Sequence, residues 1–146
     1  MISGFSHVTC YVLDQDRAKA FYTEKLGFTL NTDVSMGDGF EGAGHGFRWL
    51  TVSPPDHPEL EIILADPRMG NDDESAAAIR ALVAKGALGT GVFATDDVRK
   101  TYEELSARGV EFLQEPVERP YGVEAILRDD SGNWFSLTQH PAGGAA

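Results

Sequence analysis

The stretch ATDDVRKTYEELSARGVEF, residues 94–112, carries the local pattern from which the fold can be predicted. It starts at the end of an apolar run, GTGVFATD (89–96), and continues into a helical pattern in which Val98, Tyr102 and Leu105 share one face. Gly109 then provides a helix stop, and a new apolar run begins. The segment therefore predicts a strand, a helix over 97–108 and a second strand.

The first half of the chain repeats this pattern. FSHVTCYV (5–12) alternates as a strand does, Asp14 is a suitable helix N-cap, and Gly27 is a suitable stop. Asp14 precedes Asp97 by 83 residues (97 − 14), and Gly27 precedes Gly109 by 82 (109 − 27). This spacing, with a one-residue slip in a loop, indicates an internal duplication.

Three strand-like runs follow each predicted helix, and a helical connector over 72–86 joins the two halves. The runs are 29–34, 47–52 and 60–65 in the first half and 110–115, 122–128 and 133–139 in the second. The predicted fold class is α+β, with two tandem βαβββ modules whose curled mixed sheets surround a cleft. We expect one domain over 1–140, made of modules 3–67 and 88–140 and a connector 70–87, followed by a flexible tail, 141–146.

Composition excludes several classes of partner. The chain has 146 residues, with 12 basic and 23 acidic side chains and a net charge of −11, which repels nucleic acid and anionic lipid. Its single cysteine, Cys10, lies in an apolar run. We therefore expect Cys10 to be a small buried side chain, in a protein of a reducing compartment. No signal peptide and no apolar run of about 20 residues is present. We therefore expect a cytoplasmic protein with no membrane or nucleic-acid partner.

The doubled unit resembles the vicinal oxygen chelate superfamily, which contains glyoxalases, bleomycin-resistance proteins and extradiol dioxygenases. The resemblance extends over about residues 3–140 and implies the fold, but the superfamily supports several chemistries on one scaffold. The stretches that carry it are Ser6-His7-Val8, AFYTEKLGF (20–28), FRWLTV (47–52), ATDDVRKTYEELSARGVEF (94–112) and DDSGNWFSLTQ (129–139).

The resemblance also assigns four metal-ligand positions, one from the first and one from the last strand of each module. They fall on His7, Ile63, Thr90 and Ser136, with Glu61 two residues before Ile63 on the same face. A transition metal usually needs three or more donor side chains, and only His7 and Glu61 are candidates. We therefore expect no cofactor. His7 is expected to line a pocket beside Glu61, with metal ligand and general base as alternatives.

Strand alternation predicts that two tryptophans face the cleft. In its strand, Trp49 lies on the side away from the apolar residues that a helix should cover. Trp134 has the same orientation in the last strand. Two indoles lining a cleft would suit a planar ligand, although the rings could instead fill a closed core. The loop 37–46 contains a G-x-G-x-x-G match, but a strand follows it rather than a helix, so a dinucleotide site is rejected. The predicted ligand-binding residues are His7, Thr9, Tyr11, His45, Trp49, Thr51, Glu61, Ile63, Thr90, Val92, Trp134 and Ser136.

These observations favour a small-molecule binding protein of the bleomycin-resistance type, which sequesters an aromatic or cationic antibiotic without metal. The net charge of −11 would attract a cation. A homodimer is expected, because a second copy would cover strand edges and the aromatic face. The alternative is a metal-dependent glyoxalase-like lyase, isomerase or dioxygenase that uses His7, Glu61 and a third group, for which His45 from the loop is the candidate. A third hypothesis is a vestigial cleft with an unknown partner.

Overall fold

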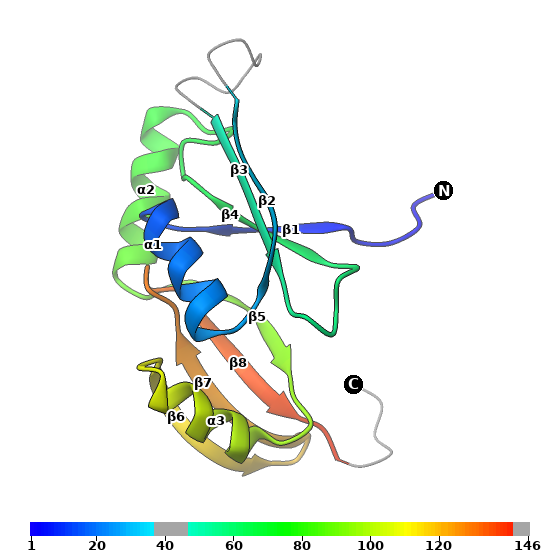
Figure 1. Ribbon diagram of the computed structural model, residues 1–146. Helices are drawn as coiled ribbons and strands as arrows, with labels where there is room; N and C mark the ends of the chain where they lie inside the picture. Colours follow the sequence, from blue (N-terminus) through cyan, green and yellow to red (C-terminus); the bar gives the residue numbers. More distant parts are fainter. Residues whose placement is uncertain (37–46, 142–146) are drawn as a thin grey trace.

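The computed structural model describes residues 1–36 and 47–141, and its elements follow the predicted order (Figure 1). The first module contains β1 (His7–Tyr11), α1 (Gln15–Ala20), a π-helix η1 (Phe21–Lys25), β2 (Thr29–Met36), β3 (Phe47–Ser53) and β4 (Glu61–Ala65). Helix α2 (Asp73–Ala84) leads to the second module, which contains β5 (Gly89–Ala94), α3 (Val98–Ala107), β6 (Glu111–Arg119), β7 (Gly122–Arg128) and β8 (Trp134–Gln139).

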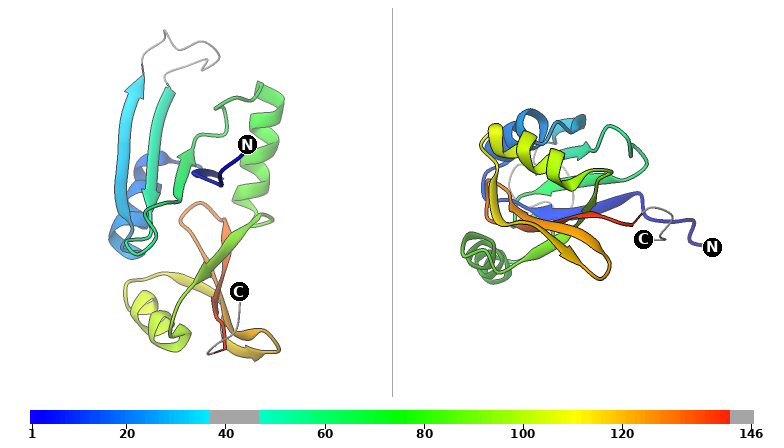
Figure 2. Two further views of the ribbon diagram at one scale, coloured as in Figure 1. Left: turned by 90° about the vertical axis from the view of Figure 1, so that its right-hand side faces the viewer. Right: turned by 90° about the horizontal axis from the view of Figure 1, so that it is seen from below.

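Each module forms a mixed four-stranded sheet. The strand orders are β1-β4-β3-β2 in sheet A and β5-β8-β7-β6 in sheet B. The first and last strands of each module are parallel, and the other neighbours are antiparallel. Figure 2 shows the two sheets one beyond the other along the molecule, with α2 beside the first module. The predicted α+β fold of two βαβββ modules is confirmed. In the described part of the chain, no helix is long and apolar enough to cross a membrane.

The first helix begins and ends where its sequence signals place it. The carboxylate of Asp14 accepts a hydrogen bond from the Arg17 backbone N–H at 3.0 Å and caps the first turn. The end of the helix widens, because the Leu26 N–H bonds to the Phe21 carbonyl five residues back, at 3.1 Å. Gly27 follows with φ of +75°, a conformation that glycine adopts without strain. The helix was predicted, but its π-helical last turn was not.

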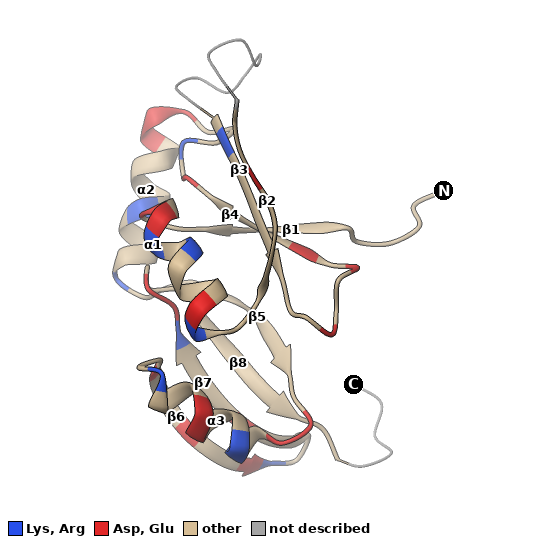
Figure 3. Ribbon diagram, viewed as in Figure 1, with Lys and Arg blue, Asp and Glu red and all other residues tan. Residues whose placement is uncertain are grey.

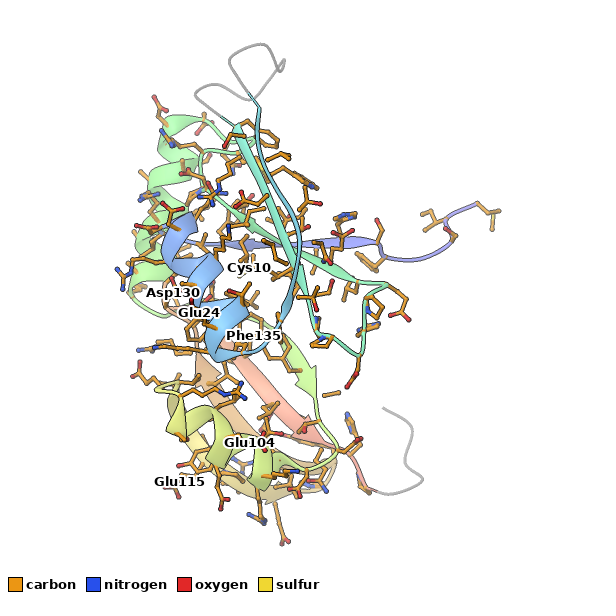
Figure 4. The ribbon with its side chains drawn as sticks, in the orientation of Figure 1. Cys10, Glu24, Glu104, Glu115, Asp130 and Phe135 are labelled. Carbon is orange, nitrogen blue, oxygen red and sulfur yellow. The ribbon has the colours of Figure 1, made fainter. Side chains whose placement is uncertain are left out.

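A single hydrophobic core serves both modules. Phe93 of β5 stacks on Phe135 of β8 with ring centroids 4.3 Å apart, and it forms a T-shaped pair with Phe28 of the first module at 5.5 Å. Figure 4 shows Phe135 near the meeting of the two modules. Helices α1, η1 and α3 cover one face of the sheets, so the alternate residues of the strands lie outside the core. The core residues are Cys10, Val12, Ala18, Phe21, Tyr22, Leu50, Val52, Ile62, Leu64, Val98, Leu105, Val110, Ala125, Leu127, Phe135 and Leu137.

The turn between β7 and β8 joins the two modules through the buried carboxylate of Asp129. Its Oδ1 accepts the backbone N–H groups of Ser131, Gly132 and Asn133, each at 2.9 Å. Its Oδ2 accepts the Tyr22 hydroxyl at 2.7 Å and the Asn133 side-chain amide at 3.0 Å. Because Tyr22 belongs to the first module, one carboxylate both shapes the turn and connects the modules.

Further bonds strengthen this junction. The Asn133 amide donates to the Tyr11 carbonyl at 2.7 Å, and the Ser131 hydroxyl accepts the Leu13 N–H at 2.9 Å. Cys10 lies beside the Tyr22 hydroxyl, with 3.6 Å between sulfur and oxygen. Burial raises the pKa of Cys10 to about 12, so the thiol stays protonated near neutral pH. Cys10 is therefore the free, buried residue that the sequence predicted.

Replacing Tyr22 by Phe is expected to lower the free energy of unfolding by about 1–3 kcal/mol, because a buried carboxylate loses a hydrogen-bond donor. Urea unfolding followed by circular dichroism measures the change. Tyr102→Phe is the matched control, since the Tyr102 ring packs edge-on against Phe112 and its hydroxyl bonds to no described residue. Equal stabilities of the two variants would contradict the importance of the Tyr22–Asp129 bond.

Candidate functional site

Each sheet presents one face to the core, and we call the other face of each sheet its open face. The strand registers assign the residues, because cross-strand partners lie on the same side of a sheet. Open face A carries His7, Thr9, Tyr11, Trp49, Thr51, Glu61 and Ile63. Open face B carries Val92, Glu124, Ile126, Arg128, Trp134, Ser136 and Thr138. Most of the predicted ligand-binding residues therefore lie on these two faces.

A polar cluster on open face A centres on the carboxylate of Glu61. Its Oε2 lies 3.1 Å from Nε2 of His7, the contact that the sequence predicted. Its Oε1 accepts the hydroxyl of Thr51 at 2.7 Å. Thr51 is fully buried, whereas the side chains of His7 and Glu61 are 33% and 27% exposed. A buried hydroxyl thus holds a carboxylate that solvent and a ligand can still reach.

Aromatic rings continue this cluster along β3. The Trp49 indole lies 5.8 Å from the His7 ring and 6.1 Å from the Phe47 ring, measured between centroids, and both pairs are tilted. Leu50 and Val52, which alternate with Trp49, are buried in the core. Trp49 therefore lies on the open side of the sheet, where an aromatic ligand could stack on it.

On open face B the indole of Trp134 lies directly over the backbone of Gly89, its register partner on β5. A Cβ added at Gly89 would overlap the ring, with only 2.7 Å to Cε2. The tryptophan therefore needs glycine at this position. Sequence analysis recognised Trp134 but not the role of Gly89, because the contact depends on the register of two strands that are far apart in the chain.

A second carboxylate, Glu124 of β7, is part of open face B. It accepts the Ser136 hydroxyl on Oε2 at 2.6 Å and the Tyr121 hydroxyl on Oε1 at 2.8 Å. The Arg119 Nε lies 3.8 Å from Oε1. Glu124 was not among the predicted site residues. The alternation in GVEAILR (122–128) was the available signal, because it places Glu124 opposite the buried Ala125.

The remaining predicted residues lie at the edge of open face B, away from it, or outside the described part of the chain. Val92 lies on the edge strand β5 and is 67% exposed. Thr90 lies in a bulge between Gly89 and Gly91, and its hydroxyl donates to the Asn133 side chain at 3.2 Å, toward the module junction. The bulge thus separates Thr90 from the residues of open face B. His45 lies outside the described residues, as does the rest of loop 37–46.

Residues 4–137 match the sequence profile described as the Glyoxalase/Bleomycin resistance protein/Dioxygenase superfamily. The chain belongs to this superfamily. The resemblance predicted from the sequence is therefore confirmed.

Similar proteins cover nearly the whole chain. The uncharacterized protein YurT of Bacillus subtilis (strain 168) is 33% identical over 129 residues, which are 88% of this chain and 93% of that protein. Among solved structures, UcmS2 is 52% identical with a TM-score of 0.84, covering 94% of this chain and 98% of its own. TnmS3, an antibiotic binding protein from Streptomyces sp. CB03234, is 30% identical with a TM-score of 0.71, covering 96% and 98%.

The side chains at the expected metal-ligand positions can be compared with what a metal centre requires. Ile63 is apolar, Thr90 donates to Asn133, and the Ser136 hydroxyl donates to Glu124. Within residues 1–36 and 47–141, no three His, Cys, Asp or Glu side chains come together as a metal site. The described residues therefore do not fit a metal centre with three or more protein ligands.

We expect Gly89→Ala to move the Trp134 indole away from β5. In a Trp49→Phe background Trp134 is the single tryptophan, and its emission should shift to longer wavelength and become easier to quench with acrylamide. Gly91→Ala is the matched control, because its Cβ would lie an ordinary 3.9 Å from the Phe135 ring. Identical spectra for the two alanine variants would refute the Gly89–Trp134 packing.

Proposed function

We propose that this protein binds a small molecule with a planar aromatic system, of the antibiotic class, and sequesters it without metal. The observation that carries the proposal is that each open face combines an indole with a carboxylate, Trp49 with Glu61 and Trp134 with Glu124. Indoles offer stacking area at little entropic cost, and the carboxylates add polar contacts. The similarity to TnmS3, an antibiotic binding protein, supports the same function.

We further propose that a second copy completes the site. In the described sheets the edge strands are β1, β2, β5 and β6. Strand β6 carries charged residues, Pro116 and bulges, which protect an edge. Strands β1 and β5 contain no Lys, Arg, Asp or Glu (Figure 3). Two copies with a net charge of −11 each would meet with least repulsion along these edges.

Exposed apolar side chains adjoin the same two edges. Ile2 and Phe5, in the segment before β1, are 94% and 83% exposed, and Val92 projects from β5. Figures 1 and 2 show the N-terminal segment extending away from the body of the molecule. Pairing of β1 of one copy with β5 of the other would cover these side chains and bring unlike open faces together. The predicted cleft would then lie between the two copies.

One observation favours an enzyme instead. The 3.1 Å contact between His7 and Glu61 pairs an imidazole with a carboxylate, an arrangement that can serve general base catalysis in a lyase or isomerase. Such an enzyme would change its substrate, whereas a sequestering protein releases its ligand intact. Mass spectrometry of the bound compound after denaturation of the protein therefore separates the two functions.

Trp49→Ala or Trp134→Ala should weaken binding of the planar dye proflavine and of a polycyclic aromatic antibiotic by about 1–3 kcal/mol, because stacking and apolar burial are lost. His7→Ala should have a smaller effect. Fluorescence titration measures the affinities. The enzyme hypothesis predicts the reverse order, with turnover abolished by His7→Ala and only an altered Michaelis constant in the tryptophan variants.

The chain is expected to sediment as a dimer, with twice the monomer mass of 15.8 kDa, at micromolar concentration. Introducing charge at the two proposed edges, as Phe5→Asp with Val92→Asp, should give a monomer because the interface would bury carboxylates. Leu82→Asp is the control, since Leu82 is an exposed apolar residue of α2. A wild-type monomer, or equal dissociation in the control, would argue against this interface.

A further inference from the structure

The two open faces carry the same two residue types in exchanged positions. The modules can be aligned on their paired core residues, Val52–Ile62 in sheet A and Leu127–Phe135 in sheet B. In this alignment Trp49 of β3 corresponds to Glu124 of β7. Glu61, at the start of β4, corresponds to Trp134 at the start of β8. The duplicated scaffold thus gives each face one indole and one carboxylate, in opposite order.

Buried hydroxyl groups fix both carboxylates. Thr51, fully buried, donates to Glu61, and Ser136, only 6% exposed, donates to Glu124. The side chains of Glu61 and Glu124 remain 27% and 16% exposed. A carboxylate has about four acceptor positions, so each can still accept a donor from a ligand. Each face therefore holds an oriented acceptor and an indole, and on face B the register places Glu124 opposite Thr138, four residues along β8 from Trp134.

Two arginines accompany the carboxylate on face B, Arg128 as a residue of the face opposite Trp134 and Arg119 near Glu124. Arg119 lies 3.8 Å from Glu124, and the guanidinium of Arg128 lies 3.8 Å from Glu111 and packs over Gly86. The field of the whole chain is negative, at −11. The negative net charge therefore favours a cationic ligand over one with anionic groups at its periphery.

We infer that Glu61 and Glu124 are the polar anchors of the ligand site, and that the site selects planar aromatic molecules with N–H or O–H donors at their periphery, cations in preference to anions. This inference rests on the proposed function, because it names the ligand chemistry of the same site. The buried hydroxyls of Thr51 and Ser136 act as positioning groups that hold the two acceptors.

Three tricyclic probes test the selection without any mutation. Proflavine is a cation with primary amino groups at both ends, acridine orange is a cation whose end groups are dimethylated, and anthraquinone-2,6-disulfonate is anionic at both ends. The wild-type protein should bind proflavine most tightly, acridine orange less tightly and the disulfonate least. A hydrogen bond to a charged acceptor corresponds to about tenfold in affinity or more.

Variants test the two anchors. Glu61→Gln and Glu124→Gln should each weaken proflavine binding by about tenfold and lower the ratio of proflavine to acridine orange affinity. Ser136→Ala should lower the same ratio, and Ser136→Thr should restore it. Glu104→Gln is the matched control, because it removes an equal charge from α3, on the helical side of the protein (Figure 4). Thermal melts verify that each variant is folded.

The possible failures are distinguishable. If the three probes bind equally, or if the Glu61 and Glu124 variants behave as Glu104→Gln does, the inference about the anchors is overturned. The proposed function then still stands, provided that the Trp49 and Trp134 variants weaken binding. If no probe binds, or if the tryptophan variants bind normally, the proposed function fails and the inference fails with it.

Discussion

The buried carboxylate of Asp129 is the interaction on which the arrangement of the two modules depends. It accepts three backbone N–H groups of its own turn and the hydroxyl of Tyr22, 107 residues away in the chain. A buried charge is tolerated only when its acceptor positions are occupied. The turn, the π-helical end of the first helix and the end of β1 must therefore stay together, and one common core forms in place of two.

The common core in turn determines which surfaces are available for function. Helices α1, η1 and α3 cover one face of the sheets, so every second strand residue lies on an open face. On these faces Ser136 stands where a metal-binding relative would place a ligand, and its hydroxyl holds Glu124. The face that the resemblance associates with metal coordination thus carries an oriented hydrogen-bond acceptor and an indole.

Charge and strand edges connect this site to assembly. The acidic residues that give the chain its net charge of −11 are absent from β1 and β5, although both are edge strands. Protected edges often carry charge or proline, as β6 does and as β1 and β5 do not. The contrast between β6 and the uncharged edges supports a second copy as the partner that completes the proposed site. Ligand binding and dimerisation would then depend on the same surfaces.

The sequence alone determined the elements and much of open face A. Helix caps such as Asp14 and Gly27 act within a few residues, and strand alternation sufficed to place Trp49 and the His7–Glu61 pair on one face. Only the tertiary structure decided the rest. The bulge that turns Thr90 away, the glycine beneath Trp134 and the partners of Glu124 depend on registers between distant strands. The hydrogen bonds of Asp129 to the backbone of its own turn are local. Its bond to Tyr22 forms only when the two modules pack together. No short-range pattern in the sequence specifies which distant group a buried acceptor will meet.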